Sequence, residues 1–152
     1  MTPDVNVLIA AFRDEHVHHL RARAWLLDAC AQSAATRVGA GPSGGTLQLI
    51  THVMASFLRL VTHARVFATP TPIEQAVAFL DVLVDSPGVS ILDTSNAWPV
   101  LRQLCLDKKL VANAIPDALI ATAVMQHKKV LATFDRDFSR LLPPHQLQLL
   151  LG

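Results

Sequence analysis

Apolar residues follow two different spacings along this chain, and the two spacings alternate. Short unbroken apolar runs are typical of buried strands, whereas apolar residues recurring every three or four positions are typical of helices packed on one face. We expect strands at residues 4–9, 47–50, 89–92, 129–133 and 146–151, the last at an edge of the sheet. We expect helices at residues 18–30, 53–61, 72–86, 99–106 and 117–127, and a turn with a short helix at 134–142. This alternation predicts an α/β sandwich with a mainly parallel central sheet.

The segments between these elements indicate a single domain. Residues 32–45 are poor in large apolar side chains and contain four glycines, which is typical of a loop. This loop is too short to link two domains, and residues 113–116 are expected to be a simple connection between helices. The chain has 152 residues, a common length for one domain. We therefore assign residues 1–152 to one domain.

Composition narrows the class of protein. No apolar run approaches the roughly 18–20 residues that a membrane-spanning helix needs, and the first residues lack the features of a signal peptide, so we expect a cytoplasmic protein without membrane contact. The net charge of +1 gives no overall signature of nucleic-acid binding. A hydrophobic content of 51% is more than one small core readily buries. Because large exposed apolar patches mark interfaces, composition also favours a homodimer.

The two cysteines, Cys30 and Cys105, lie in apolar segments that are predicted to be helical. They form no CxxC motif and have no zinc-binding spacing with histidine. Buried free thiols are the favoured interpretation, and a disulfide between the two is the alternative.

Three aspartates lie where a site is expected in an open parallel sheet, outside the carboxyl ends of the strands. Asp135 follows a predicted strand, Asp4 lies in the first one, and Asp117 opens a predicted helix. Two carboxylates about 4 Å apart repel by roughly 4 kcal/mol at an effective dielectric near 20. Three that converge either raise their pKa values or bind a cation. Oxygen ligands without His or Cys suit Mg²⁺ or Mn²⁺, so these acids are a candidate metal site.

Each of these acids also has a simpler explanation. Asp117 fits an ordinary first-turn residue favoured by the helix dipole, Asp135 and Asp137 fit a solvated turn, and Asp4 fits an exposed terminus. The seven histidines show no ligand spacing, and His16, His18 and His19 fit the exposed start of a helix. The candidates for phosphate contact are three arginines, Arg59, Arg65 and Arg136.

Three stretches, in their order and placement, resemble a known family. They are "PDVNVLIAAF" at the N-terminus, "FLRLVTHARVF" in the middle and "IPDALIATAVMQHKKVLATFDRDF" near the end. Together they resemble a PIN domain over nearly the whole chain, and more narrowly a VapC-type ribonuclease toxin of a bacterial toxin–antitoxin pair.

The resemblance implies an α/β/α sandwich whose acids gather around Mg²⁺ or Mn²⁺ and cut RNA. Asp4 matches the family's first acid, Asp117 in "PDA" the third and Asp135 in "TFDRDF" the fourth. Asp137 fits an auxiliary acid, while Asn6 and Thr133 match residues that usually orient the first and fourth acids. The resemblance also implies a cognate antitoxin whose C-terminal segment blocks the acidic site.

The chain departs from the family at the second acid. The family has Glu three residues before the arginine of its central helix, and here that position is Ser56 before Arg59. Serine is a poorer metal ligand than a carboxylate, so the metal would bind more weakly, use more water or draw on Asp137. Three hypotheses follow: a metal-dependent endoribonuclease toxin, a PIN-like RNA- or protein-binding module with weakened catalysis, and a phosphatase-like or other hydrolase using the same acids.

Overall fold

The computed structural model describes residues 1–36 and 46–151. In this part of the chain, short strands alternate with helices as expected. The strands are β1 (Thr2–Pro3), β2 (Gln48–Leu49), β3 (Ser90–Ile91), β4 (Leu131–Thr133) and β5 (Leu147–Leu149). The α-helices are α1 (Val5–Phe12), α2 (His19–Thr36), α3 (Thr51–Val61), α4 (Ile73–Val84), α5 (Trp98–Lys108) and α6 (Ala114–Gln126). Two short 3₁₀ helices, η1 (Arg136–Arg140) and η2 (Pro144–Gln146), follow β4.

The strands form two parallel ladders, β1-β4-β5 and β2-β3, which lie edge to edge in the order β3-β2-β1-β4-β5. β4 pairs with β1 on one side and β5 on the other, and β2 pairs with β3. The backbone N–H of Gln48 donates to the carbonyl of Met1 at 2.9 Å, which joins the two ladders. β1 and β4 are buried throughout, so the middle of the sheet holds the first residues of the chain beside residues 131–133.

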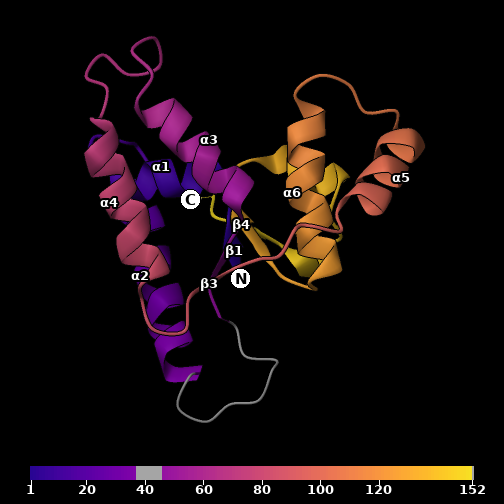
Figure 1. Ribbon diagram of the computed structural model, residues 1–152, viewed down its shortest axis with the longest axis horizontal. Coiled ribbons are helices and arrows are strands. Elements are labelled where there is room, and N and C mark those ends of the chain that lie inside the picture. The colour runs from indigo at the N-terminus through magenta and orange to yellow at the C-terminus, as the bar shows by residue number, and fades with distance from the viewer. Residues whose placement is uncertain (37–45, 152) are drawn as a thin grey trace.

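Helices cover both sides of this sheet. α1 packs against α2 and α3, α3 packs against α4, and α5 packs against α6. Figure 1 shows α1–α4 to the left of the strands and α5 and α6 to the right. The predicted α/β/α sandwich is therefore confirmed. No helix of the described residues is long and apolar enough to cross a membrane.

The prediction of a strand at residues 4–9 is wrong, because this run forms α1. Val7, Leu8 and Ala10 are completely buried on successive faces of the helix, so the run lacks the polar face that marks an amphipathic helix. A short continuous apolar run does not distinguish a buried strand from a buried helix. The deciding signal is Asp4, whose side chain accepts a hydrogen bond from the N–H of Val5 as an N-cap.

Other boundaries also differ from the prediction. α6 begins at Ala114, so residues 114–116 belong to the helix and not to a connection. α2 continues to Thr36, which moves the start of the predicted loop, and residues 37–45 of that loop lie outside the described residues. β5 lies at an edge of the sheet as expected. Cys30 and Cys105 are free thiols, both half-buried.

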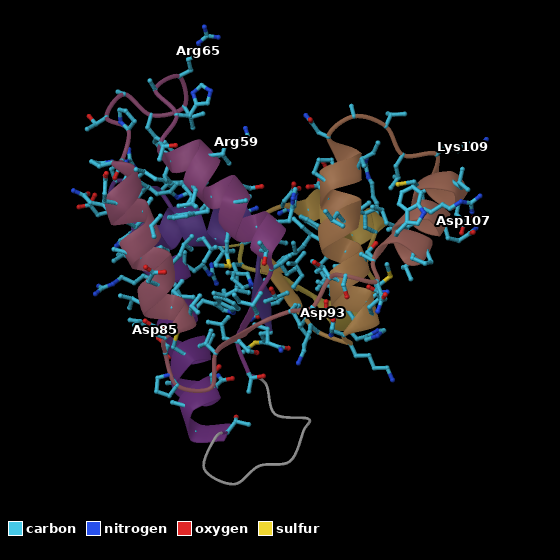
Figure 2. All side chains as sticks on the ribbon, in the orientation of Figure 1. Arg59, Arg65, Asp85, Asp93, Asp107 and Lys109 are labelled. Atoms are coloured by element: carbon cyan, nitrogen blue, oxygen red, sulfur yellow. The ribbon has the colours of Figure 1, made fainter. Side chains whose placement is uncertain are left out.

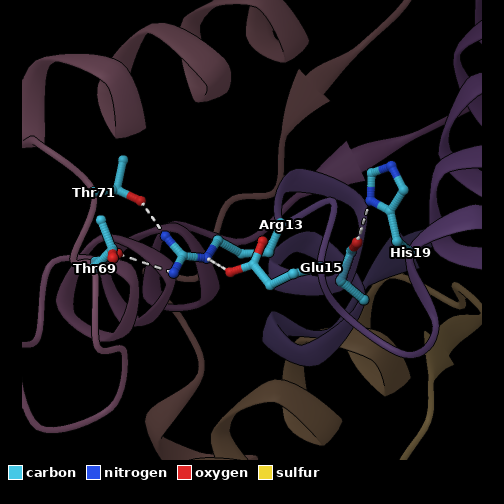
Figure 3. Close-up of polar contacts among 6 residues, drawn as sticks. Arg13, Glu15, His19, Thr69 and Thr71 are labelled. Atoms are coloured by element: carbon cyan, nitrogen blue, oxygen red, sulfur yellow. Dashed lines mark hydrogen bonds and ion pairs between the residues drawn. The ribbon is translucent and has the colours of Figure 1, made fainter.

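Arg13 anchors the C-terminal end of α1. Its guanidinium donates to the hydroxyl of Thr71 at 2.9 Å and to the carbonyl of Thr69 at 3.0 Å, and Nε lies 2.7 Å from the carboxylate of Glu15. The guanidinium carbon also lies 4.1 Å from the ring centroid of Phe67, a cation–π contact. Figure 3 shows these polar contacts joining α1 to the segment between α3 and α4. They fix the direction of the helix that Asp4 begins.

Candidate active site

Asp4 is the most buried of the predicted site acids. It is 4% exposed and lies between β1 and α1, at the carboxyl end of the strand. One carboxylate oxygen accepts from the N–H of Val5 at 2.7 Å. The other accepts from the amide of Asn6 at 2.7 Å and from the hydroxyl of Thr133 at 2.7 Å. These donors hold the carboxylate in one orientation.

Thr133 and Asn6 connect the first strand with the end of β4. The hydroxyl of Thr133 accepts from the backbone N–H of Asp135 at 3.0 Å, and the side-chain oxygen of Asn6 accepts from the N–H of Phe134 at 3.2 Å. Thr133 thus contacts Asp4 and the backbone of Asp135 at once. The two residues expected to orient the first and fourth acids are in position to do so.

Asp135 and Asp137 lie on the turn that follows β4. Asp135 caps η1 by accepting from the N–H of Asp137 at 2.8 Å. The side chain of Asp137 is exposed and lies 3.9 Å from Arg140. Asp137 is exposed, as a solvated turn would have it. Asp135 is half-buried, and its charge raises the pKa of Asp117.

Electrostatics shows that Asp117 belongs to the same neighbourhood. Burial raises the pKa of Asp117, and the charges of Asp135 and Asp137 raise it further, while His52 opposes this shift. Burial likewise raises the pKa of Asp4 to about 6, against the hydrogen bonds of Thr133 and Val5, and Asp117 and Asp135 add to the rise. The charges of neighbouring acids therefore raise the pKa values of Asp4 and Asp117, although Asp4 precedes α1, Asp117 lies in α6 and Asp135 lies in the turn after β4.

These acids have no basic ion-pair partner in the described chain. The ion pairs found there, Arg13 with Glu15 and Arg140 with Asp137, leave Asp4, Asp117 and Asp135 without a balancing cation. Within residues 1–36 and 46–151, however, no three His, Cys, Asp or Glu side chains are gathered closely enough to hold a metal ion by themselves. Mg²⁺ commonly keeps several waters and uses one or two carboxylates together with substrate phosphates. A metal ion held by these acids would therefore need water or a substrate phosphate among its ligands.

Ser56 shares a helix face with His52, a residue that the sequence analysis set aside. His52, Ser56 and Arg59 are spaced at i, i+4 and i+7 in α3, which places them on one face. The charge of His52 also lowers the pKa of Asp117 in α6, so the His52 end of this face lies near that acid. The four-residue spacing of His52 from Ser56 could have indicated from the sequence that His52 lies on the same helix face.

The predicted arginines differ in position. Figure 2 shows Arg59 projecting outward from α3 and Arg65 at the outer edge of the loop after it. Arg136 is exposed at the start of η1, directly beside Asp135. Arg59 and Arg136 therefore lie on elements that carry the candidate site, whereas Arg65 lies farther out.

A pocket of about 500 Å³ adjoins the acids. Asp117 and Asp137 form part of its wall, and Lys108, Asn113 and Arg140 form another part. These three residues were missed by the sequence analysis, since they carry no motif and are brought together only by the turns around α5, α6 and η1.

Metal affinity is expected to fall as the pH drops below about 6. The raised pKa of Asp4 means that its carboxyl binds a proton in this range, and the proton competes with the cation for the same oxygen atoms. Above pH 6 the carboxylate is ionised and available, so affinity should level off. Calorimetric titration with MnCl₂ between pH 5 and 8 measures this, and a flat profile would contradict it. An Asp4→Asn variant, which lacks this carboxylate, should bind Mn²⁺ more weakly than the wild type at every pH, and Asp117, whose pKa is also raised, should keep part of the pH dependence.

The chain matches the model of the PIN domain family over residues 1–141. It is 35% identical to Ribonuclease VapC31 of Mycobacterium tuberculosis over 141 residues, covering 90% of this chain and 89% of that protein. It is 34% identical to Ribonuclease VapC25 of the same species over 144 residues, with the same coverage. The crystal structure of VapBC2 from Rickettsia felis, bound to a DNA fragment from their promoter, has a similar fold, with a TM-score of 0.62 at 17% identity over 97% of this chain and 96% of that one. The chain belongs to the PIN domain family and, within it, to the VapC group.

Proposed function

We propose that this protein is an endoribonuclease toxin that cuts RNA with the help of Mg²⁺ or Mn²⁺ and is neutralised by a cognate antitoxin. The observation that carries the proposal is the buried carboxylate of Asp4, which shares an electrostatic neighbourhood with Asp117 and Asp135. Burial of an unpaired carboxylate is costly, and a bound cation offsets this cost. The names of the mycobacterial relatives, both ribonucleases, support the same activity.

Each acid has a distinct part in holding the ion. Asp4 offers a carboxylate fixed by three donors, so little orientation entropy is lost when a cation binds. Asp117 and Asp135 complete the acidic wall from α6 and η1, and exposed Asp137 contributes at its rim. When bound, Mg²⁺ or Mn²⁺ activates water and neutralises negative charge on the phosphate under attack. Arg59 and Arg136 are placed to contact neighbouring RNA phosphates.

The direct test is RNA cleavage by the purified protein in Mg²⁺ or Mn²⁺, compared with the same reaction in EDTA. We expect internal cuts that require the metal and stop when it is chelated. Cleavage that persists in EDTA would overturn the metal-dependent mechanism. An absence of cleavage across total RNA, transfer RNA and ribosomal RNA would overturn the nuclease itself.

Replacing Ser56 with glutamate is expected to raise metal affinity about tenfold, because carboxylate count tunes the affinity of a site for hard cations. Ser56 is half-buried on the face of α3 that also carries His52, so the longer side chain should reach toward Asp117. Ser56→Gln, which has the same length without the charge, is the matched control. Calorimetric titration with Mn²⁺ measures the change, and equal affinities for the two variants would show that position 56 does not serve the site.

The second candidate function is a PIN-like module that binds RNA or protein with weakened catalysis. Ser56 favours it, because serine supplies no negative charge at the place of the family's second acid. The two candidates differ in one measurement. A binding module associates with RNA but leaves it intact at saturating Mn²⁺, whereas the enzyme produces fragments.

The antitoxin is expected to present a basic side chain to the acids. An arginine would fit, since its forked donors match carboxylates and its charge would compete with the metal. Co-expression of a small gene adjacent to this one tests the proposal. If growth arrest persists and the product of that gene does not co-purify with this protein, the proposed toxin–antitoxin pair is contradicted.

We also propose that the protein is a homodimer. α5 has no fully buried residue, and its Trp98 and Leu106 are 67% and 57% exposed. Trp and other large apolar side chains are favoured in interface cores, so this helix is a candidate contact. Light scattering at high micromolar concentration measures the mass, and a monomer under those conditions contradicts the proposal.

A further inference from the structure

The pocket beside Asp117 and Asp137 has two chemically different sides. Lys108 at the end of α5 and Arg140 at the end of η1 provide positive charge. Leu110, Ala114 and Leu141 provide an apolar surface. Asp117 and Asp137 close the remaining side. A ligand that fills this space must therefore carry an anionic group and a flat or apolar group, with one end beside the acids.

The basic side chains are available to such a ligand. Lys108 is exposed and has no ion pair within the described residues. Arg140 is 81% exposed at its side chain, and its single acidic neighbour, Asp137, lies at 3.9 Å, beyond good hydrogen-bond length. An exposed pair of this kind contributes little to stability, so exchanging it for a contact with an anionic ligand costs little.

Asn113 adds a neutral polar group to the same pocket. It precedes the first helical residue of α6 but forms no capping hydrogen bond through its side chain. The connection that holds it is strained, because Lys109 and Ala112 have φ angles of 49° and 50° without being glycine. Strained backbone persists where the surrounding structure fixes it, and it concentrates at binding sites. The exposed amide of Asn113 thus lines the pocket with its donors and acceptor unused by the helix cap.

We propose that this pocket holds the nucleotide adjacent to the phosphate that is cut, and this inference rests on the proposed ribonuclease function. Lys108 and Arg140 contact the phosphate of that nucleotide, the apolar surface receives its base, and Asn113 hydrogen-bonds the edge of the base. RNA supplies the required ligand chemistry, since it carries a phosphate and a planar base in each unit. The volume of about 500 Å³ lies in the range of pockets for small organic ligands. Single-stranded RNA is read in this way, through splayed bases and their edges.

The phosphate contacts are tested with a Lys108→Ala/Arg140→Ala double variant. Its matched control is Arg21→Ala/Arg23→Ala, which removes two exposed charges from α2 on the other flank of the sheet. Binding of a short single-stranded RNA is followed by fluorescence anisotropy in EDTA over a range of salt concentrations. For single strands, each lost phosphate contact lowers the slope of log K against log salt by about 0.7. Because both side chains contact the same phosphate, we expect the slope to fall by about 0.7 for the double variant and to stay unchanged for the control.

The same variants are then compared in cleavage assays with Mn²⁺. We expect KM to rise several-fold in the double variant while kcat stays within about twofold, because the charges act on binding and not on the reacting atoms. Equal salt slopes for the double variant and the control would overturn the subsite. So would a double variant that binds RNA normally but no longer binds the antitoxin, since this would assign the pocket to a protein partner. If the wild type cuts no RNA, the proposed function fails, and the salt slopes alone still decide whether the pocket binds a nucleotide.

The base contact is tested with Asn113→Asp and Asn113→Ala. The first replaces the amide donors with acceptors, and the second removes both. Fragments from a randomised RNA are sequenced to give the base preference beside the cut. We expect Asn113→Ala to flatten the preference at one position and Asn113→Asp to shift it toward bases that donate a hydrogen bond there. An unchanged preference in both variants would overturn the assignment of Asn113.

Discussion

Asp117→Asn is expected to reduce RNA cleavage by about 10³-fold or more, since metal-ion catalysis supplies several kcal/mol of transition-state stabilisation. Asparagine keeps the shape of the side chain but removes the charge that attracts the cation. The fold should remain intact, because Asp117 is half-buried and makes no hydrogen bond that defines α6 in the described chain. Cleavage at saturating Mn²⁺, followed with a labelled RNA, measures the loss.

The same substitution should stabilise the metal-free protein at neutral pH. Burial and the neighbouring acids raise the pKa of Asp117. At neutral pH, its ionised carboxylate therefore lowers the stability of the folded protein. Removing the charge therefore relieves repulsion there, and the advantage should fade as the pH falls and the wild-type carboxyl takes up a proton. Asp81→Asn, on an exposed face of α4, is the matched control for activity and thermal unfolding. Full activity of the Asp117→Asn variant would disprove its role in the site.

Gly88→Ala is expected to destabilise the protein by about 3 kcal/mol, from a left-handed backbone of about 1–2 kcal/mol and an overpacked contact of about 1–3 kcal/mol. Gly88 has a φ angle of 77°, and an added Cβ would collide with the backbone carbonyl of Ser33 in α2. Neither the backbone of a helix nor the chain before β3 can move away cheaply. For a chain of this size the melting temperature should fall by about 6–12 °C.

Ser86→Ala provides the control for Gly88→Ala. It lies in the same turn, and its hydroxyl donates to the carbonyl of Val82 near the surface, so its loss should cost less than about 1 kcal/mol. Thermal unfolding followed by circular dichroism compares the two variants. Similar melting temperatures would show that the connection between α4 and β3 yields to the added methyl group.

The order of elements was predictable because hydrophobic spacing records which face of each segment is buried. The first segment was the exception. A short apolar run of residues 5–12 looks the same to sequence analysis whether it is extended or helical, and only the capping position of Asp4 distinguishes the two. The start of α6 was missed for a related reason, since Pro116 is tolerated in a first helical turn and does not mark its boundary.

The acids of the candidate site were proposed from their positions relative to strands and from the resemblance to a family, and their role as metal ligands stays a prediction. The pocket beside them was not predicted. Lys108, Asn113 and Arg140 come from separate elements, and their approach depends on left-handed residues at Lys109 and Ala112. Non-glycine residues seldom adopt that conformation, so nothing in the sequence indicates it. His52 was missed because Asp117, whose pKa its charge lowers, lies on another element of the chain.

The pairing of β1 with β4 has a consequence for the timing of activity during synthesis. Asp4 receives its hydrogen bond from Thr133, which lies 129 residues later in the chain. At about 5–20 residues per second, a ribosome needs about 6–26 s to make that interval. Until the end of this time β1 lacks its partner β4, and Asp4 lacks the hydroxyl of Thr133 that orients it. A nascent chain therefore cannot assemble the proposed site, and the translation machinery that makes the protein is exposed to it only after synthesis is nearly finished.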